Sequence, residues 1–179
     1  GADYSTLLGA VSVDGNISGV TAFNMGKLTD GRGALFIDSA KSTSSMITDL
    51  IYFDGETLKS EFFDKTTKQT EATLRYNTLL CTDINGDGTT DIPFAKLLPG
   101  YENMSADERM YLTIWRSFDG KKYADALVGD FNYDDGYYFE FPSAWLDKVT
   151  LVYDKATNMH SYRLWNTEHN SALSEIVRL

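Results

Sequence analysis

The sequence predicts an all-β fold in which short strands follow one another as a mainly antiparallel meander. Asp-Gly pairs recur along the chain, and both residues tolerate the positive φ angles of tight hairpin turns. The runs between the pairs are short and rich in β-branched and aromatic residues, as strands are. No long stretch has the apolar spacing of a helix. The pairs begin at Asp14, Asp30, Asp54, Asp87, Asp119 and Asp135.

The predicted strands are the β-rich runs that these turns separate. Two short helical turns are expected beside them, at 105–108, which has a capping-box pattern, and at 142–148, which has proline in its first turn. The runs expected as strands are 34–37, 46–53, 58–63, 79–82, 92–98, 110–118, 123–130, 137–141, 149–153, 161–165 and 176–179.

Two parts of the chain share a Phe-Asp-Gly core, at Phe53 and at Phe118, and each follows a run opened by methionine. A long repeat with several strands in each unit is typical of propeller blades or stacked meanders. The fold is therefore expected to contain partial propeller-like blades, with a β-sandwich as the alternative. The competing explanation is that hairpin proteins reuse Asp-Gly turns without a repeat. We expect residues 1–179 to form one all-β domain, alone or as part of a longer exported protein.

The net charge of the chain limits the classes of partner that we expect. It carries 26 acidic and 16 basic residues, for a formal net charge of −10. A negative field repels nucleic-acid phosphates and anionic membrane surfaces, so neither is an expected partner. No apolar run approaches the roughly 18 residues of a spanning helix, so membrane insertion is not expected. Cys81 is the single cysteine, which excludes an internal disulfide, and its apolar neighbours predict a buried thiol.

The segment 83–91 has the residue types of a calcium-binding loop. Calcium takes six to eight oxygen ligands at roughly 2.3–2.6 Å, and alternate oxygen-bearing side chains in a tight loop converge on one point. Gly88 permits the sharp turn. The alternative is a plain Asp-Gly hairpin whose carboxylates accept backbone amides. The predicted ligands are Asp83, Asn85, Asp87, the carbonyl of Thr89, and Asp91.

The pattern Asp-x-Asn-x-Asp-Gly-x-x-Asp in this segment resembles the calcium loops of integrin-type and bacterial surface β-propellers, the FG-GAP and VCBS-like repeats. The resemblance covers the loop and its flanks. It implies that the loop joins two strands of a blade, that the next strand begins at Asp91, and that the protein is bacterial and lies outside the cytoplasm. Such propellers carry more blades than this chain can hold. The alternatives are therefore part of a propeller or another β fold with the same loop.

Helical calcium modules fit this segment less well. An EF-hand has a bidentate glutamate at its twelfth position, between two helices, whereas Phe94 stands there and the flanks are predicted strands. Dockerins carry two copies followed by helices, and Pro93 argues against a helix after this loop. A second acidic stretch, 130–136, begins similarly but has no acid at its ninth position, so we interpret it as a turn.

The markers of catalysis are weak. His160 and His169 lack the spacing of a zinc protease, and no nucleophile elbow or phosphate-binding loop is present. Glu61, Glu140 and Asp147 are the carboxylates considered for glycoside cleavage, which requires a closely spaced pair.

The densest aromatic cluster, 131–141, offers rings that stack on sugars or form a protein contact. Its alternate residues are also the expected core face of a strand, with Tyr138 on the opposite face. We expect a non-enzymatic, calcium-stabilised β-repeat module of an exported or surface protein. The alternatives are a carbohydrate- or peptide-binding module and a glycan-acting hydrolase. A glycan or protein partner is thus left open.

Overall fold

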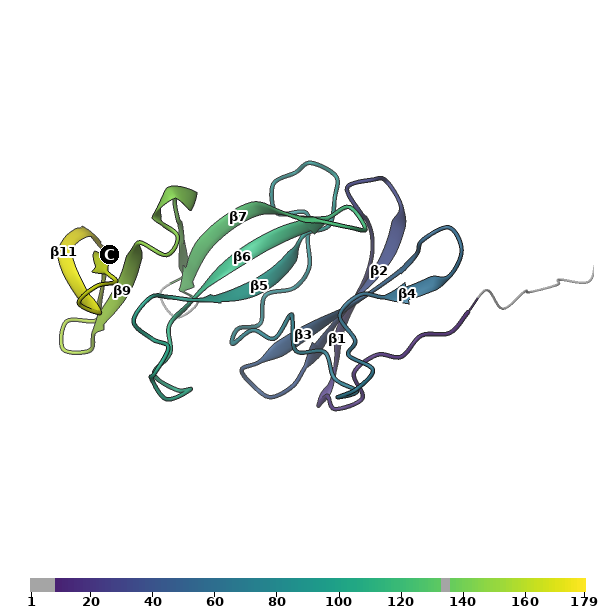
Figure 1. Ribbon diagram of the computed structural model, residues 1–179, viewed down its shortest axis with the longest axis horizontal. Coiled ribbons are helices and arrows are strands. Elements are labelled where there is room, and N and C mark those ends of the chain that lie inside the picture. Colours follow the sequence, from purple (N-terminus) through teal and green to yellow (C-terminus); the bar gives the residue numbers. More distant parts are fainter. Residues whose placement is uncertain (1–8, 133–135) are drawn as a thin grey trace, which may run out of the picture. The chain divides into compact units, whose positions relative to one another are not determined.

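The structure is a computed structural model that describes residues 9–132 and 136–179. The predicted all-β class is confirmed, and the strands and one short 3-10 turn follow one another along the chain (Figure 1). No helix among the described residues has the length and apolar character needed to span a membrane. The elements are β1 (Gly19–Lys27), β2 (Gly33–Ala40), β3 (Met46–Phe53), β4 (Leu58–Ser60), β5 (Ile92–Leu97), β6 (Tyr111–Phe118), β7 (Tyr123–Asn132), β8 (Tyr137–Glu140), η1 (Ser143–Trp145), β9 (Val149–Asp154), β10 (Met159–Asn166) and β11 (Ser171–Arg178).

The strands form three sheets in which neighbours in sequence are neighbours in space. The strand orders are β1-β2-β3-β4, β5-β6-β7-β8 and β11-β10-β9, which is the predicted meander. The pairings of β1 with β2, β2 with β3 and β3 with β4 are antiparallel, as are those of β9 with β10 and β10 with β11. Sequential hairpins require only short connections, which suits the frequent turn residues of this chain.

Three of the predicted Asp-Gly turns, at Asp30, Asp54 and Asp119, connect consecutive strands. The turns at Asp54 and Asp119, which follow the two Phe-Asp-Gly cores, have the same hydrogen bonds. In each, one oxygen of the aspartate accepts the amides two and three residues further on, at 2.7–2.9 Å. The next glycine is left-handed, with φ of 108° at Gly55 and 89° at Gly120. The repeated motif therefore encodes one local geometry twice.

The Asp-Gly pair at Asp14 does not form a hairpin, so the turn predicted there is wrong. Asp14 precedes β1 and is buried, where its Oδ2 accepts hydrogen bonds from Lys41 Nζ and the Thr70 amide, each at 2.9 Å. Its own amide donates to Asp49 Oδ2 at 3.3 Å. Burial raises the pKa of Asp49, and the nearby Asp14 charge raises it further. The pair at Asp135 lies outside the described residues.

The predicted strand 79–82 is wrong as well. Only an isolated bridge between Thr82 and Asp91 forms there. The backbone of this stretch instead serves buried side chains, since the Leu79 carbonyl accepts from Arg75 Nε at 2.8 Å and the Cys81 amide donates to Asp38 Oδ2 at 2.9 Å. Groups that a strand ladder would pair are therefore already occupied. The predicted strand 58–63 is shortened to β4.

Strand β1 was not among the predicted strands. It pairs only with β2 and so lies at the edge of its sheet. Its burial therefore lacks the pattern of a core strand, and Phe23 and Met25 are 68% and 74% exposed. The helical turn expected at 142–148 is present as η1, which follows Pro142, whereas 105–108 forms a single hydrogen-bonded turn from the Glu108 amide to the Ser105 carbonyl.

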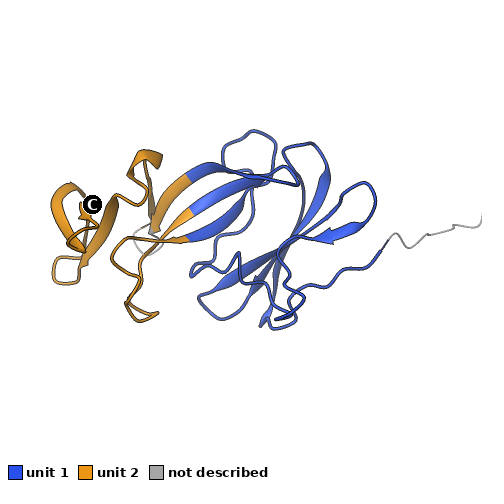
Figure 2. Ribbon diagram, viewed as in Figure 1, with its two compact units in different colours: residues 1–95, 114–127 blue, residues 96–113, 128–179 orange. Residues whose placement is uncertain are grey.

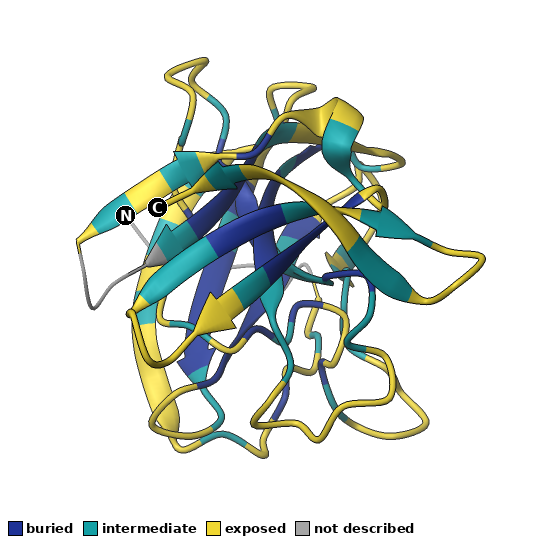
Figure 3. Cartoon of the chain, turned by 90° about the vertical axis from the view of Figure 1, so that its left-hand side faces the viewer, coloured by how far each residue is buried: buried dark blue, intermediate teal, exposed yellow. Residues whose placement is uncertain are grey.

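The chain divides into two compact units (Figure 2). One contains residues up to 95 together with 114–127, and the other contains 96–113 together with 128–179. The expectation of one domain over 1–179 stays a prediction. In Figure 3 buried residues run along strands, whereas the loops and turns are mostly exposed.

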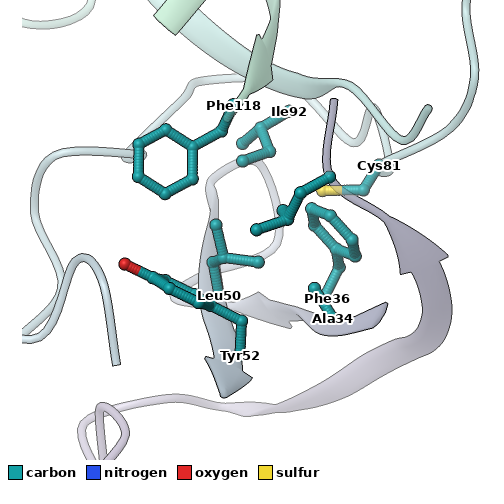
Figure 4. Packing of buried hydrophobic residues seen from close by; sticks show 8 residues of the cluster. Ala34, Phe36, Leu50, Tyr52, Cys81, Ile92 and Phe118 are labelled. Carbon is teal, nitrogen blue, oxygen red and sulfur yellow. The ribbon is translucent and has the colours of Figure 1, made fainter. Parts of the chain in front are cut away.

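The first unit has an apolar core built by β2, β3 and the segments that follow them (Figure 4). Tyr52 and Phe118 meet edge to face with ring centroids 5.9 Å apart. Burying such side chains contributes about 1.5–3 kcal/mol each, which is the main source of stability in a domain of this size. The cluster consists of Leu28, Ala34, Phe36, Leu50, Tyr52, Cys81, Ile92 and Phe118. The predicted buried thiol is confirmed.

A buried ion pair lies beside this core. The guanidinium of Arg75 and the carboxylate of Asp38 are 0% and 1% exposed, and Arg75 Nη2 lies 2.9 Å from Asp38 Oδ1. Thr48 Oγ1 donates to the same carboxylate oxygen at 2.6 Å and accepts from Arg75 Nη1 at 3.0 Å. Burying a charged pair is favourable only when each charge is paired and hydrogen-bonded, as both are here.

Candidate metal-binding loop

The predicted calcium loop is a closed turn whose ends are fixed by backbone hydrogen bonds. The Thr82 amide donates to the Asp91 carbonyl at 3.2 Å, and the Asp91 amide donates back at 2.8 Å. The Thr90 amide donates to the Lys27 carbonyl on β1 at 3.0 Å. The next residue, Ile92, begins β5 and is fully buried. The loop therefore connects directly to the core of the first unit.

Asp83 organises the first half of the loop. Its Oδ1 accepts the amides of Gly86 at 2.8 Å and Asp87 at 3.0 Å, while its Oδ2 accepts the amide of Gly88 at 2.8 Å. Both glycines are left-handed, with φ of 77° at Gly86 and 86° at Gly88. The sharp turn predicted at Gly88 is confirmed by this left-handed φ. Glycine suits the position because L side chains rarely adopt that conformation.

Asp87 organises the second half. Its Oδ1 accepts the Thr89 amide at 2.8 Å and the Thr89 hydroxyl at 2.5 Å, and its Oδ2 accepts from Asn85 Nδ2 at 3.0 Å. These hydrogen bonds, first those from Thr89, lower the pKa of Asp87. The loop is thus folded around two carboxylates, those of Asp83 and Asp87.

Asp91 differs from the other loop carboxylates because it is buried, with 0% of its surface exposed. Its Oδ2 accepts the Ile84 amide at 3.1 Å. Its Oδ1 is buried and has no hydrogen-bond partner among the residues that the structure describes. Burial, together with the nearby charges of Asp87 and Asp83, raises the pKa of Asp91 to about 6. A buried carboxylate oxygen without a partner is costly, and it distinguishes Asp91 from the two carboxylates that accept the loop's own amides.

All five predicted ligand residues lie on this one loop. Asp83 and Asp87 direct oxygens to the loop's own amides, as in the plain-turn alternative. As they stand, the side chains of the described residues form no group of three or more His, Cys, Asp or Glu arranged to hold a metal. The donor set nevertheless fits calcium chemically. Asp83 Oδ2 and Asp87 Oδ2 each accept one hydrogen bond and keep a second lone pair, and Asp91 Oδ1 has both of its lone pairs available.

Gly26 is a residue of this region that the sequence pattern did not reveal. A Cβ placed on it would lie 2.0 Å from Thr90 Oγ1 and 3.2 Å from the Phe36 ring. Its β1 backbone therefore packs directly against the loop's last turn. Periodicity alone does not distinguish this glycine from others in strands, because the clash comes from a residue distant in sequence.

Gly26→Ala is expected to destabilise the protein by about 1–3 kcal/mol, because the added methyl overpacks the contact with Thr90. The matched control is Gly33→Ala on the adjacent strand, where a Cβ meets nothing within 4 Å. Urea unfolding of both variants measures the difference. Equal stabilities of the two variants would contradict the close packing of β1 against the loop.

The second unit holds another polar cluster that sequence reasoning missed. Tyr162 Oη donates to Asp130 Oδ2 at 2.6 Å, and His160 Nδ1 lies 3.7 Å from that oxygen and 3.3 Å from Tyr137 Oη. Burial and the Asp130 charge raise the pKa of Tyr162. His160 lies on β10, directly before the predicted strand 161–165. No pattern along the sequence links these four residues.

Two of the three carboxylates considered for glycoside cleavage, Glu61 and Asp147, have structural partners. Glu61 accepts hydrogen bonds from Tyr52 at 3.2 Å and Tyr123 at 3.0 Å. Asp147 pairs with Lys96 at 2.7 Å, and Glu140 is exposed at the end of β8.

The aromatic cluster 131–141 is only partly described, since Tyr133, Asp134 and Asp135 lie outside the described residues. Tyr138 is 56% exposed, as predicted, and it stacks on Phe131 with centroids 5.3 Å apart.

No protein-family model matches this sequence, and searches of curated proteins and of solved structures found no match. The proposal for its function therefore rests on the loop 83–91, its backbone hydrogen bond to β1 and its three carboxylates.

Proposed function

We propose that the loop 83–91 binds one calcium ion and that the chain is a non-enzymatic, calcium-stabilised β-repeat module. The unpartnered, buried Oδ1 of Asp91 carries this proposal. A bound dication would supply the partner that this oxygen lacks and offset the repulsion among the three loop carboxylates. The ligands would be the side-chain oxygens of Asp83, Asn85, Asp87 and Asp91 and the carbonyl oxygen of Thr89.

The proposed role of the metal is structural. The loop ends at Ile92, which belongs to the apolar core, and Thr90 bonds to β1. A ligand that binds only the folded loop stabilises the fold by mass action. The loop contains no group positioned as a nucleophile or a general base, so its chemistry supports a structural metal ion that stabilises the fold. The pattern's resemblance to FG-GAP and VCBS-like loops supports the same reading.

We further propose that the protein works outside the cytoplasm of a bacterium, as an exported or surface protein. Extracellular calcium modules bind with dissociation constants on the order of 10⁻⁴–10⁻³ M, a range that external calcium fills. A loop with three carboxylates and no dedicated bidentate glutamate suits such a site. Calcium in that setting would keep the loop folded without acting as a signal.

Calcium at about 100 times its dissociation constant is expected to raise the Tm by about 5–10 °C, and EDTA to reverse the rise. Differential scanning calorimetry of the chain with calcium, with magnesium and with EDTA measures this. The increment should be larger with calcium than with magnesium, because magnesium demands a tighter octahedral site.

Two variants separate a specific site from general charge screening. Asp83→Asn should abolish the calcium increment, whereas Asp119→Asn should leave it unchanged, because Asp119 caps an Asp-Gly hairpin with the same kind of amide hydrogen bonds. A calcium increment that survives Asp83→Asn, or none in the unsubstituted chain, would sink the proposal.

A further inference from the structure

A pocket of about 640 Å³ in the first unit is lined by three lysines. It lies between the segment before β1, strand β4 and the turn that follows β4. Its lining residues are Ala10, Val11, Ser12, Thr57, Leu58, Lys59, Ser60, Phe63, Lys65 and Lys68, none of them acidic. In a chain of net charge −10, this is a local reversal of sign.

Two of these cations have no counter-ion among residues 9–132 and 136–179. Lys59 Nζ pairs with Asp54 at 3.0 Å, but Lys65 and Lys68 make no ion pair with any residue that the structure describes. Asp64, the acid next to Lys65, accepts the amides of Thr66 at 2.6 Å and Thr67 at 3.2 Å through its Oδ1. Glu71, the acid nearest to Lys68 in sequence, is exposed.

Lys68 has a left-handed backbone conformation, which glycine and asparagine adopt more readily than lysine does. It has a φ of 59°, in a turn of four residues closed by the bridge between Asp64 and Gln69. Two turns of the same kind occur elsewhere, one between Asp154 and Met159 and one between Asn166 and Ser171. The left-handed position is Asn158 in the first and Asn170 in the second.

Asparagine is the non-glycine residue that tolerates this conformation best, because its short polar side chain hydrogen-bonds locally, which a lysine side chain does not. A lysine in this left-handed position therefore points to a function for its side chain. Ser60 adds a second polar feature to the pocket, because its Oγ is buried and has no hydrogen-bond partner.

We propose that this pocket binds an acidic saccharide, one that carries carboxylate or sulfate groups. The ammonium groups of Lys65 and Lys68 would face the anionic groups as separate point charges, and no arginine is present to bind one planar anion bidentately. The hydroxyls of Ser12 and Thr57, both exposed residues of the lining, donate and accept, which suits sugar hydroxyls. Phe63 offers an apolar surface for the C–H face of a sugar ring.

The volume is in the range of small-ligand pockets, about 300–1,000 Å³, and it favours a short oligosaccharide. The net negative charge opposes long polyanions at a distance, but the screening length of about 8 Å at physiological salt leaves the local lysines dominant. Binding is therefore expected to weaken as salt is added, and short acidic oligosaccharides should bind better per sugar than long ones.

The test is isothermal titration calorimetry of the full chain at fixed free calcium, with a galacturonate trisaccharide, a sulfated chondroitin disaccharide, maltotriose and sodium sulfate. Binding of either acidic saccharide, with neutral maltotriose at least tenfold weaker, supports the proposal, and the tighter of the two identifies the anionic group. No binding of either one overturns it. Sodium sulfate competing as strongly as the saccharides overturns the saccharide class.

The double variant Lys65→Gln, Lys68→Asn should weaken acidic-saccharide binding roughly 10–100-fold, since two charge-assisted contacts are lost. Its Tm should not fall, because asparagine is the residue that the sister turns carry at this position. The matched control is Lys155→Gln, which removes the lysine that follows Asp154 as Lys65 follows Asp64. Unchanged binding in the double variant, or equal loss in the control, overturns the assignment.

Discussion

Arg75→Met is expected to lower the free energy of unfolding by about 3–5 kcal/mol, the largest single effect we anticipate. The guanidinium is fully buried and lies 2.9 Å from the carboxylate of Asp38, which is 1% exposed. Methionine fills much of the volume but leaves this carboxylate charged, buried and without a cation. The Leu79 carbonyl, which accepts from Arg75 Nε, loses its partner as well. Chemical denaturation of purified protein measures the change.

A matched arginine on the surface separates the buried charge from loss of arginine itself. Arg116 pairs with Asp125 at 2.8 Å, but their side chains are 34% and 42% exposed, so Arg116→Met should cost about 1 kcal/mol or less. The double variant Asp38→Asn, Arg75→Met should recover part of the loss, because the uncompensated charge is gone. If Arg75→Met lowers the free energy of unfolding by no more than Arg116→Met does, the buried ion pair does not stabilise the contact between β2 and the segment around Arg75.

Asp91→Asn is expected to have opposite effects in the absence and the presence of calcium. In calcium-depleted buffer near pH 8, it should stabilise the fold by up to roughly 3 kcal/mol, because a pKa raised from 3.8 to about 6 disfavours the ionised native carboxylate by that amount. In saturating calcium it should lose the metal-dependent increment and become less stable than the unsubstituted chain.

The pH dependence of this difference has a defined sign. Between about pH 4 and 6 the native state holds a proton on Asp91 that the unfolded chain has released, so stability falls as pH rises through this window. The stability gap between the Asp91→Asn variant and the parent in calcium-depleted buffer should therefore open from pH 4 to 6 and stay constant above it. Comparing the two proteins cancels the titration of carboxylates outside the loop 83–91. A constant gap across this range would contradict the buried, raised carboxylate.

The sequence by itself determined the local structure. Asx-type hydrogen bonds and left-handed glycines act within a few residues, so the turns at Asp54 and Asp119 and the sharp turn at Gly88 could be predicted from the residues alone. The β class followed for the same reason, because alternation, β-branched content and turn spacing are local properties. The residues of the proposed calcium site are predicted from the same kind of local pattern.

The tertiary structure decided which polar groups are buried. Asp14 has the same Asp-Gly signature as the hairpins, yet contacts with Lys41 and Thr70 bury it. The run 79–82 has strand-like residues, yet its backbone serves Arg75 and Asp38. The lysine pocket likewise unites segments that are about 50 residues apart in sequence.

The proposed calcium loop combines both levels. Its order of oxygen-bearing residues is written in the sequence and resembles a known calcium loop. Whether that order makes a hairpin that only caps its own amides or a site that calls for a cation depends on Asp91. The bridge to Thr82 and the burial of neighbouring Ile92 draw this carboxylate inside and leave one oxygen without a partner. Burial is a long-range property, so it emerges only when strands distant in sequence pack together.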